Sequence, residues 1–155
     1  MTEGSLLSLE TFLPYRLSIV SNLVSDLIAT AYEQLFALRI PEWRMIAVIA
    51  ETEGITQQAL CAQTRMDKVT VSRAAIALIG RGLIERRPHP ADKRSHLLHL
   101  SMTGHTLYAQ VAPKALEIET CIFGAFEQTD RAQLHAILDR IETATCAARA
   151  ILTKD

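Results

Sequence analysis

The chain has 155 residues, of which 49% are hydrophobic and 21% are charged. This balance predicts a globular protein with a buried core and argues against an intrinsically disordered chain. The formal net charge of −1 argues, by itself, against a protein that binds nucleic acid. No apolar run approaches the roughly 18 residues that a membrane-spanning helix needs, so no membrane partner is expected.

The first predicted element is a long helix over residues 10–36, followed by a shorter one from residue 40. Pro14 and Pro41 suit the first turns of these helices, because a helix start leaves its amide hydrogens unpaired. Apolar residues at helical spacing predict a buried stripe on the first helix: Leu13, Leu17, Val20, Val24, Leu27, Ala31 and Leu35. The core face of the second helix is expected to hold Ile46, Ala47, Ile49 and Ala50.

Two short helices over residues 56–63 and 67–79 follow, separated by a turn of three residues. Thr56 and Asp67 are their predicted N-caps, since side-chain oxygens there accept hydrogen bonds from free amides. The inward stripe of the second of these helices is expected to be Val71, Ala74, Ala75, Leu78 and Ile79. Its opposite face carries Lys68, Val69, Thr70, Ser72 and Arg73. This is the helix-turn-helix arrangement, whose second helix enters the major groove of DNA.

A hairpin is predicted next, with strands over residues 83–87 and 95–100. Pro88, Pro90 and Asp92 lie in its tip, which cannot be helical. A basic hairpin that follows a helix-turn-helix is typical of a wing. Residues 65–94 hold eight Lys or Arg and three Asp or Glu. The rest of the chain holds eight Lys or Arg and 14 Asp or Glu. The charge is therefore +5 over residues 65–94 and −6 elsewhere, which indicates a phosphate-binding surface; the alternative is a solvated charged face.

After the hairpin, Ser101 is the predicted N-cap of a helix over residues 102–126, which Pro113 should kink or break. Thr129 and Asp130 should cap a last helix. Its apolar stripe holds Leu134, Ile137, Leu138, Ile141, Ala144, Ala148, Ile151 and Leu152. Exposed contiguous apolar patches are rare in monomers, so the last helix, together with the long first helix, is expected to form a dimerisation layer. The alternative is that they complete the core of a monomer.

The chain resembles the MarR family of bacterial winged-helix regulators. The residues that carry the resemblance are Thr70-Val71-Ser72-Arg73, Arg81-Gly82-Leu83-Ile84, Asp92-Lys93-Arg94, Leu98-His99-Leu100-Ser101 and Gly104. The resemblance implies a mainly α fold with a small β-hairpin wing, as one domain over residues 1–155. Residues 40–101 would form the winged helix-turn-helix lobe, and residues 10–36 and 102–152 the helices that join two subunits. Arg65 departs from the glycine that many such turns carry.

The expected DNA contacts lie on the recognition helix and the wing. The major-groove candidates are Lys68, Thr70, Ser72 and Arg73, and which of them touch bases rather than phosphates stays open. Arg94 is expected in the minor groove, and Arg86, Arg87 and Lys93 are phosphate candidates or solvated surface residues. Asp92 is too acidic for a DNA contact. We expect it to hold Arg94 or Arg73 in place, as the resemblance also implies.

The resemblance further implies a small-molecule effector, bound between the dimer layer and the DNA-binding lobe. Polar or aromatic candidates are Arg16, Asn22, Trp43 and Arg44, with an ordinary surface role as the alternative. Residues 13–18 and 40–44 are similar to members that govern hydroxycinnamate breakdown, some of which respond to the aryl-CoA thioester. The predicted protein is a cytoplasmic homodimer that binds a pseudo-palindromic operator, as a repressor released by an aromatic acid or its CoA thioester. The alternatives are a ligand-independent DNA-binding or protein-interaction module and a cysteine redox sensor.

Other chemistry finds little support in the sequence. Cys61, Cys121 and Cys146 are predicted to be reduced, because they are an odd number without CxxC spacing. They are also predicted to lie in the core, because Cys61 occupies a packed position of the helix-turn-helix and the other two fall on the stripes of the last two helices. The family's peroxide-sensing branch uses a cysteine near the N-terminus, and none precedes Cys61. The crowded histidines His89, His96, His99 and His105 lack HxxxH spacing or a cysteine partner, so no metal or cofactor is expected. Neither a P-loop nor a G-x-S-x-G motif is present, so the chain is not expected to be an enzyme.

Overall fold

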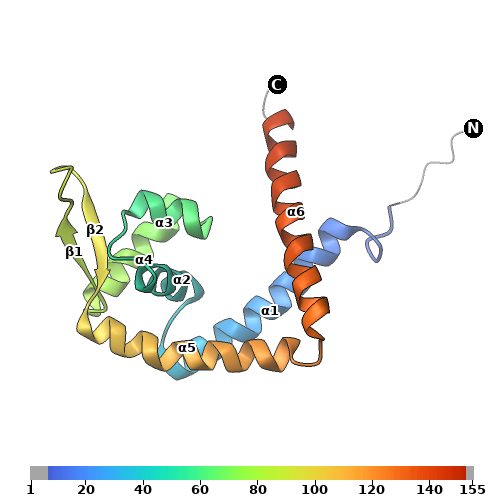
Figure 1. Cartoon of the computed structure of the whole chain (residues 1–155), viewed down its shortest axis with the longest axis horizontal. Coiled ribbons are helices and arrows are strands. Elements are labelled where there is room, and N and C mark those ends of the chain that lie inside the picture. The colour runs from blue at the N-terminus through green and yellow to red at the C-terminus, as the bar shows by residue number, and fades with distance from the viewer. Residues whose placement is uncertain (1–6, 153–155) are drawn as a thin grey trace, which may run out of the picture. The chain divides into compact units, whose positions relative to one another are not determined.

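The computed structural model describes residues 7–152, which are mainly helical with one two-stranded antiparallel hairpin (Figure 1), as predicted. The elements are α1 (Leu13–Phe36), α2 (Ile40–Ala50), α3 (Gln57–Thr64), α4 (Lys68–Gly80), β1 (Ile84–Pro88), β2 (His96–Leu100), α5 (Met102–Phe123) and α6 (Gln128–Leu152). They fall into two compact units, one up to Lys114 and one from Ala115. Within residues 7–152, no helix is long and apolar enough to cross a bilayer.

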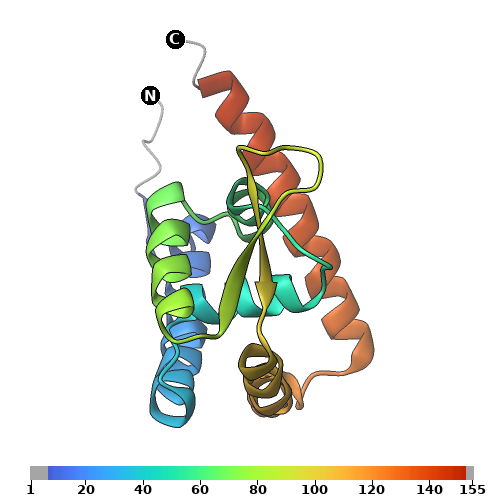
Figure 2. The same ribbon diagram turned by 90° about the vertical axis from the view of Figure 1, so that its left-hand side faces the viewer.

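The hydrophobic core lies in the first unit, where α2, α3 and α4 pack on one another and α2 and α4 also contact the hairpin (Figures 1 and 2). Its largest fully buried side chains are Leu38, Met45, Ile46, Ile49, Leu60, Val71, Leu78, Leu98 and Val111. On α4, the predicted inward stripe is confirmed at Val71, Ala74, Ala75 and Leu78, while Ile79 is half-buried. Met45 was absent from the predicted core face of α2. Burial of this surface fixes α4 on the lobe.

The helix-turn-helix is stabilised by the predicted caps. The Thr56 hydroxyl oxygen accepts a hydrogen bond from the Ala59 amide at 3.1 Å, and Asp67 Oδ1 accepts one from the Thr70 amide at 2.8 Å. Between the two helices, Arg65 has a left-handed backbone with φ 56°. A residue with a Cβ atom is strained in this conformation, which is why glycine often occupies it. The tight turn therefore forms in the usual way despite the arginine.

The hairpin register runs from Ile84 opposite Leu100 to Pro88 opposite His96. The first strand begins one residue later than predicted. The reason is that the Leu83 amide donates to the Leu78 carbonyl of α4 at 2.9 Å. Pro88 is the last residue of β1 and not part of the tip, which a strand end allows because no further ladder bond is required there. Ile55 forms an isolated antiparallel bridge with Leu98.

Two predictions for the long helices α1 and α5 were wrong. The apolar stripe of α1 was expected to be buried, yet within one chain Leu13 is 77% exposed and Tyr32 is the one buried residue of that helix. Within residues 7–152, most of this face is left uncovered. Helix α5 includes Pro113 and ends at Phe123, three residues before its predicted end.

The second unit contains the end of α5 and all of α6. The Phe123 and Phe126 rings lie 6.1 Å apart and line a groove of about 390 Å³ with side chains of α6 such as Leu134 and Ile137. Asp130 Oδ2 accepts a hydrogen bond from the Glu127 amide at 3.3 Å, whereas Thr129 lies within the first turn. Helix α6 has no buried residue, so its apolar stripe stays open in the single chain.

Candidate nucleic-acid interface

The first turns of α4 present the residues predicted to enter the major groove. Lys68 and Arg73 are exposed, and Thr70 and Ser72 are half-buried. The Thr70 hydroxyl donates to Asp67 Oδ2 at 2.7 Å, so its only hydrogen is already engaged. Toward DNA, Thr70 therefore offers its methyl group and its oxygen lone pairs, which suit a thymine methyl or a base amino group.

Asp67 remains charged at this helix start. Its pKa is held below the ordinary value by the hydrogen bond from the Thr70 hydroxyl and then by that from the Thr70 amide. The carboxylate lies at the positive end of the helix, where it stabilises the first turn. The start of the recognition helix is thus ordered by its own sequence before any DNA is bound.

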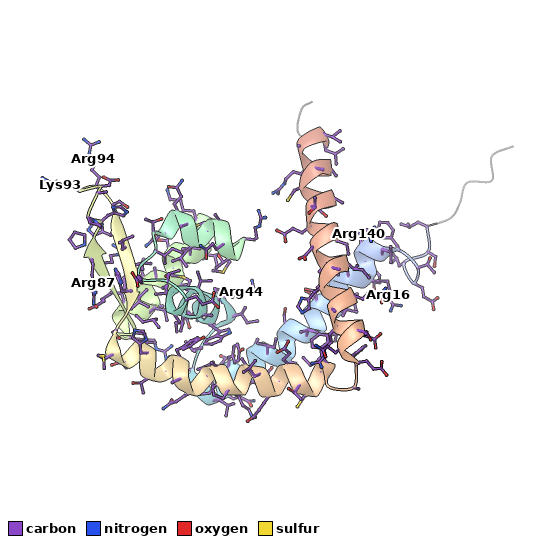
Figure 3. All side chains as sticks on the ribbon, in the orientation of Figure 1. Arg16, Arg44, Arg87, Lys93, Arg94 and Arg140 are labelled. Atoms are coloured by element: carbon purple, nitrogen blue, oxygen red, sulfur yellow. The ribbon has the colours of Figure 1, made fainter. Side chains whose placement is uncertain are left out.

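The wing tip is folded by Asp92. Its Oδ1 atom accepts a hydrogen bond from the Arg94 amide at 2.9 Å, and its carbonyl accepts one from the Ser95 amide at 3.0 Å. Asp92 thus contacts Arg94 through the backbone amide of Arg94, and its role in orienting the Arg94 guanidinium stays a prediction. Figure 3 shows Lys93 and Arg94 at the outer end of the hairpin. Both side chains are exposed at the tip, where they can contact a bound molecule.

The two arginines of β1 lie in different surroundings. Arg86 and Arg94 line a cleft of about 250 Å³ beside the first residues of α3, Thr56 and Gln57. Arg87 points to the other face of the strand, where its Nε atom donates to Glu85 Oε1 at 3.1 Å. An exposed ion pair of this kind contributes little to stability, but it neutralises part of the charge of Arg87. Arg86 is therefore the better placed of the two for a phosphate.

Arg81 is a functional candidate that the sequence did not reveal. Its guanidinium donates to the Ala37 carbonyl at 2.8 Å and the Phe36 carbonyl at 3.2 Å, at the end of α1. It also lies 3.8 Å from Glu42 Oε2. A cation at a helix C-terminus satisfies carbonyls that would otherwise lack partners. Arg81 thereby ties the end of the recognition helix to the end of α1.

The ligand candidates are brought together only in part. Trp43 stacks on Tyr108, with ring centroids 5.8 Å apart, and meets Tyr32 edge-on at 5.5 Å. Burial raises the pKa of Tyr32. Arg16 lies 16 residues before Tyr32 on the same helix, which is about 24 Å along its axis. Within one chain, Arg16 thus lies far from Trp43, and Asn22 lies about 15 Å along the axis from Tyr32 on the same count.

The cysteine prediction was wrong for two of the three thiols. Cys121 and Cys146 are exposed in the single chain and Cys61 is half-buried. The periodicity of α5 and α6 had placed the first two on apolar stripes, but these stripes are themselves uncovered. In the described part of the chain, no group of three or more His, Cys, Asp or Glu side chains is arranged to hold a metal.

A helix pair joined by a tight turn and followed by a hairpin with basic residues at its tip defines the winged helix-turn-helix class of DNA-binding proteins. Residues 38–95, which contain this arrangement, match the model of the MarR family. Over this segment the chain is thus similar to the MarR family of transcriptional regulators.

Three similar proteins illustrate the relationship. The chain is 27% identical over 96 residues to the HTH-type transcriptional regulator BilQ of Clostridium symbiosum, which covers 62% of this chain and 67% of that protein. A MarR/EmrR family regulator from Acinetobacter sp. ADP1 superimposes with a TM-score of 0.84 at 26% identity, covering 91% and 99% of the two chains. CouR from Rhodococcus jostii RHA1, solved with p-coumaroyl-CoA, has the same fold, with a TM-score of 0.78, 22% identity and coverage of 86% and 94%. Alignments with the curated relatives span 54–67% of those proteins' lengths.

Proposed function

We propose that the chain is a homodimeric, sequence-specific DNA-binding regulator, a repressor that a small aromatic acid or its CoA thioester releases from its operator. The observation that carries the DNA-binding part is the exposed, basic start of α4 beside a hairpin with Lys93 and Arg94 at its tip. A helix of this kind reads base edges in the major groove, and a basic tip favours the negative potential of a minor groove.

The exposed apolar side chains of α1 and α6 support dimerisation. On α6, Leu134, Ile137, Leu138 and Ile141 are each between 40% and 42% exposed and recur at helical spacing. On α1, Leu17, Val20 and Leu27 are 44%, 50% and 51% exposed. Burying apolar surface contributes about 25 cal/mol per Å², so a second copy that covered both faces would gain substantial stability. The proposed partner for these faces is an identical subunit.

The aromatic group around Trp43 supports the proposed effector class. A flat aromatic acid can pack against indole and phenol rings by offset stacking. The Arg44 guanidinium is exposed one residue further on α2 and is a candidate partner for a carboxylate or phosphate. The p-coumaroyl-CoA in the CouR structure is a property of that protein, and it guides the choice of compounds to test.

A ligand of this class should raise the melting temperature and release the operator. A compound that binds only the folded state adds about 2.7 kcal/mol at a hundred times its Kd. Thermal shift with a panel of aromatic acids and their CoA thioesters, followed by operator titration, measures both effects. Trp43→Ala should lose the shift, whereas Trp43→Phe, which keeps a ring, should retain part of it. If no compound in the panel both raises the melting temperature and lowers operator affinity, the ligand-independent alternative is correct.

A further inference from the structure

A small basic notch lies between the start of α2 and the recognition helix. It has a volume of about 200 Å³. Its lining residues are Arg39, Pro41, Glu42, Thr70, Arg73, Ala74 and Ala77. Two of its lining residues are arginines, and two of them, Thr70 and Arg73, belong to the predicted major-groove face. Arg39 was not among the expected DNA contacts.

Two arginines and one glutamate, Glu42, line the notch, and the glutamate already has partners of its own. Glu42 is 8% exposed, and its Oε2 atom accepts a hydrogen bond from the Arg39 amide at 2.9 Å and lies 3.8 Å from the Arg81 guanidinium. Its charge is thus already compensated. Arg39 and Arg73 are exposed, and neither is paired with an acidic side chain in the part of the chain that the structure describes.

An unpaired arginine at the rim of a concave site, here Arg39, can hold an oxyanion. Guanidinium groups donate two parallel hydrogen bonds to phosphate or carboxylate oxygens, and the volume admits one such group. The site borders the first turns of α4, and a helix in the major groove is flanked by the phosphates of the DNA backbone. About half to two-thirds of protein–DNA hydrogen bonds go to phosphates and sugars, so contacts of this type are expected beside any reading helix.

We propose that Arg39, at the Arg39–Arg73 notch, binds one phosphate of the DNA backbone in each half-site and is thus a DNA-binding residue, while Arg73 beside it stays available for a base. The inference rests on the proposed function, because it assumes that α4 enters DNA. Arg39 would fix the position of the recognition helix without reading sequence. The same phosphate chemistry is available in free inorganic phosphate, and the experiment separates the two sources.

The test compares Arg39→Gln, Arg39→Lys and Gln110→Glu with the parent. The last variant makes the same change in net charge at an exposed position on α5. Each protein is titrated against a duplex selected by the parent and against a random duplex, at several salt concentrations. The fold is expected to survive in all three, because it is the backbone amide of Arg39, and not its side chain, that Glu42 binds at the start of α2. Melting curves check this.

Arg39→Gln should lower the affinity for both duplexes by the same factor, roughly tenfold. It should also lower the salt slope by about one for each subunit, since one phosphate contact is lost per half-site. Arg39→Lys should keep the parent's slope, and Gln110→Glu should change neither quantity. A parent-like slope for Arg39→Gln overturns the inference, and so does a loss confined to the selected duplex, which would indicate a base contact.

In a second experiment, the melting temperatures of the parent and of Arg39→Gln are measured with and without inorganic phosphate, to detect a site for free anions. If phosphate stabilises the parent but not Arg39→Gln, while both proteins bind DNA with the same slope, the notch takes a free oxyanion and the inference is overturned. A parent protein that binds no duplex at all overturns the proposed function itself. The two failures are therefore distinguishable, because only the second removes DNA binding from the parent.

Discussion

Replacing Arg73 with alanine should weaken the operator complex by about 1–3 kcal/mol, with a much smaller effect on random DNA. Arg73 is exposed on α4, two turns from the capped start of that helix, where an arginine can bind guanine O6 and N7 together. The measurement is the ratio of operator to random-duplex affinity. An equal loss on both duplexes would show instead that Arg73 binds a phosphate in the notch that it shares with Arg39.

Arg94→Ala should fail in a different way. The tip of the wing is presented to the minor groove, whose hydrogen-bonding pattern is degenerate, so Arg94 responds mainly to groove width and potential. Its loss should weaken binding to all sequences and lower the salt slope by about one for each subunit. Arg94→Lys keeps the charge and should restore the slope. If Arg94→Ala binds both duplexes as the parent does, the wing does not contact DNA.

The variant Asp92→Ala tests which of the two arginines, Arg73 or Arg94, depends on the Asp92 carboxylate. Because the Asp92 carboxylate binds the amide of Arg94, its removal should loosen the tip and reproduce the pattern of Arg94→Ala. Asp92→Asn retains an oxygen that can accept the same hydrogen bond and should be milder. If Asp92→Ala instead loses affinity mainly for the operator, as expected for Arg73→Ala, the carboxylate positions Arg73 and not Arg94.

Placing a charge on the stripe of α6 should abolish the dimer. Ile141→Glu puts a carboxylate at the centre of the apolar face, where burial against a second subunit would leave it unpaired and costs several kcal/mol. Deleting the residues after Arg140 should likewise give aggregates or a weakened monomer, because half of the stripe is removed. Analytical ultracentrifugation over a range of concentrations measures the result, together with operator affinity.

The matched control for this prediction is Ala136→Glu. At 100° per residue, Ala136 lies about 140° around α6 from Ile141, so the same substitution falls away from the stripe. It should leave the dimer and the operator affinity unchanged. A truncated chain that stays monodisperse and binds DNA as tightly as the intact chain would contradict the role of α6.

Features that depend on neighbours in sequence could be predicted well. The caps of α3 and α4 need only an oxygen at Thr56 and Asp67 and an amide three residues later, and the structure confirms both. The hairpin and the buried face of α4 follow from alternation and helical spacing in the same way. The proximity of Asp92 and Arg94 was also local, although the sequence could not show that the backbone amide makes the contact.

Features that depend on distant partners could not be predicted. Arg81 binds carbonyls of Phe36 and Ala37, which lie 45 and 44 residues earlier and leave no mark on side-chain patterns. The Arg39–Arg73 notch likewise exists only because the start of α2 lies beside α4. Periodicity identified the apolar faces of α1 and α6 but said nothing about what covers them. This is why the predicted burial of the α1 stripe and of Cys121 and Cys146 did not appear in the single chain.

The central claim, a dimer that reads two half-sites, is tested most directly by selecting duplexes from a random pool with the full-length protein and then measuring the stoichiometry of the complex. The account predicts an enriched pseudo-palindrome whose half-site centres lie about one helical turn, roughly 34 Å, apart. Two subunits should bind each duplex, and a spacer altered by half a turn should abolish tight binding. A pool that is not enriched, or a single half-site bound by one subunit with full affinity, would contradict it.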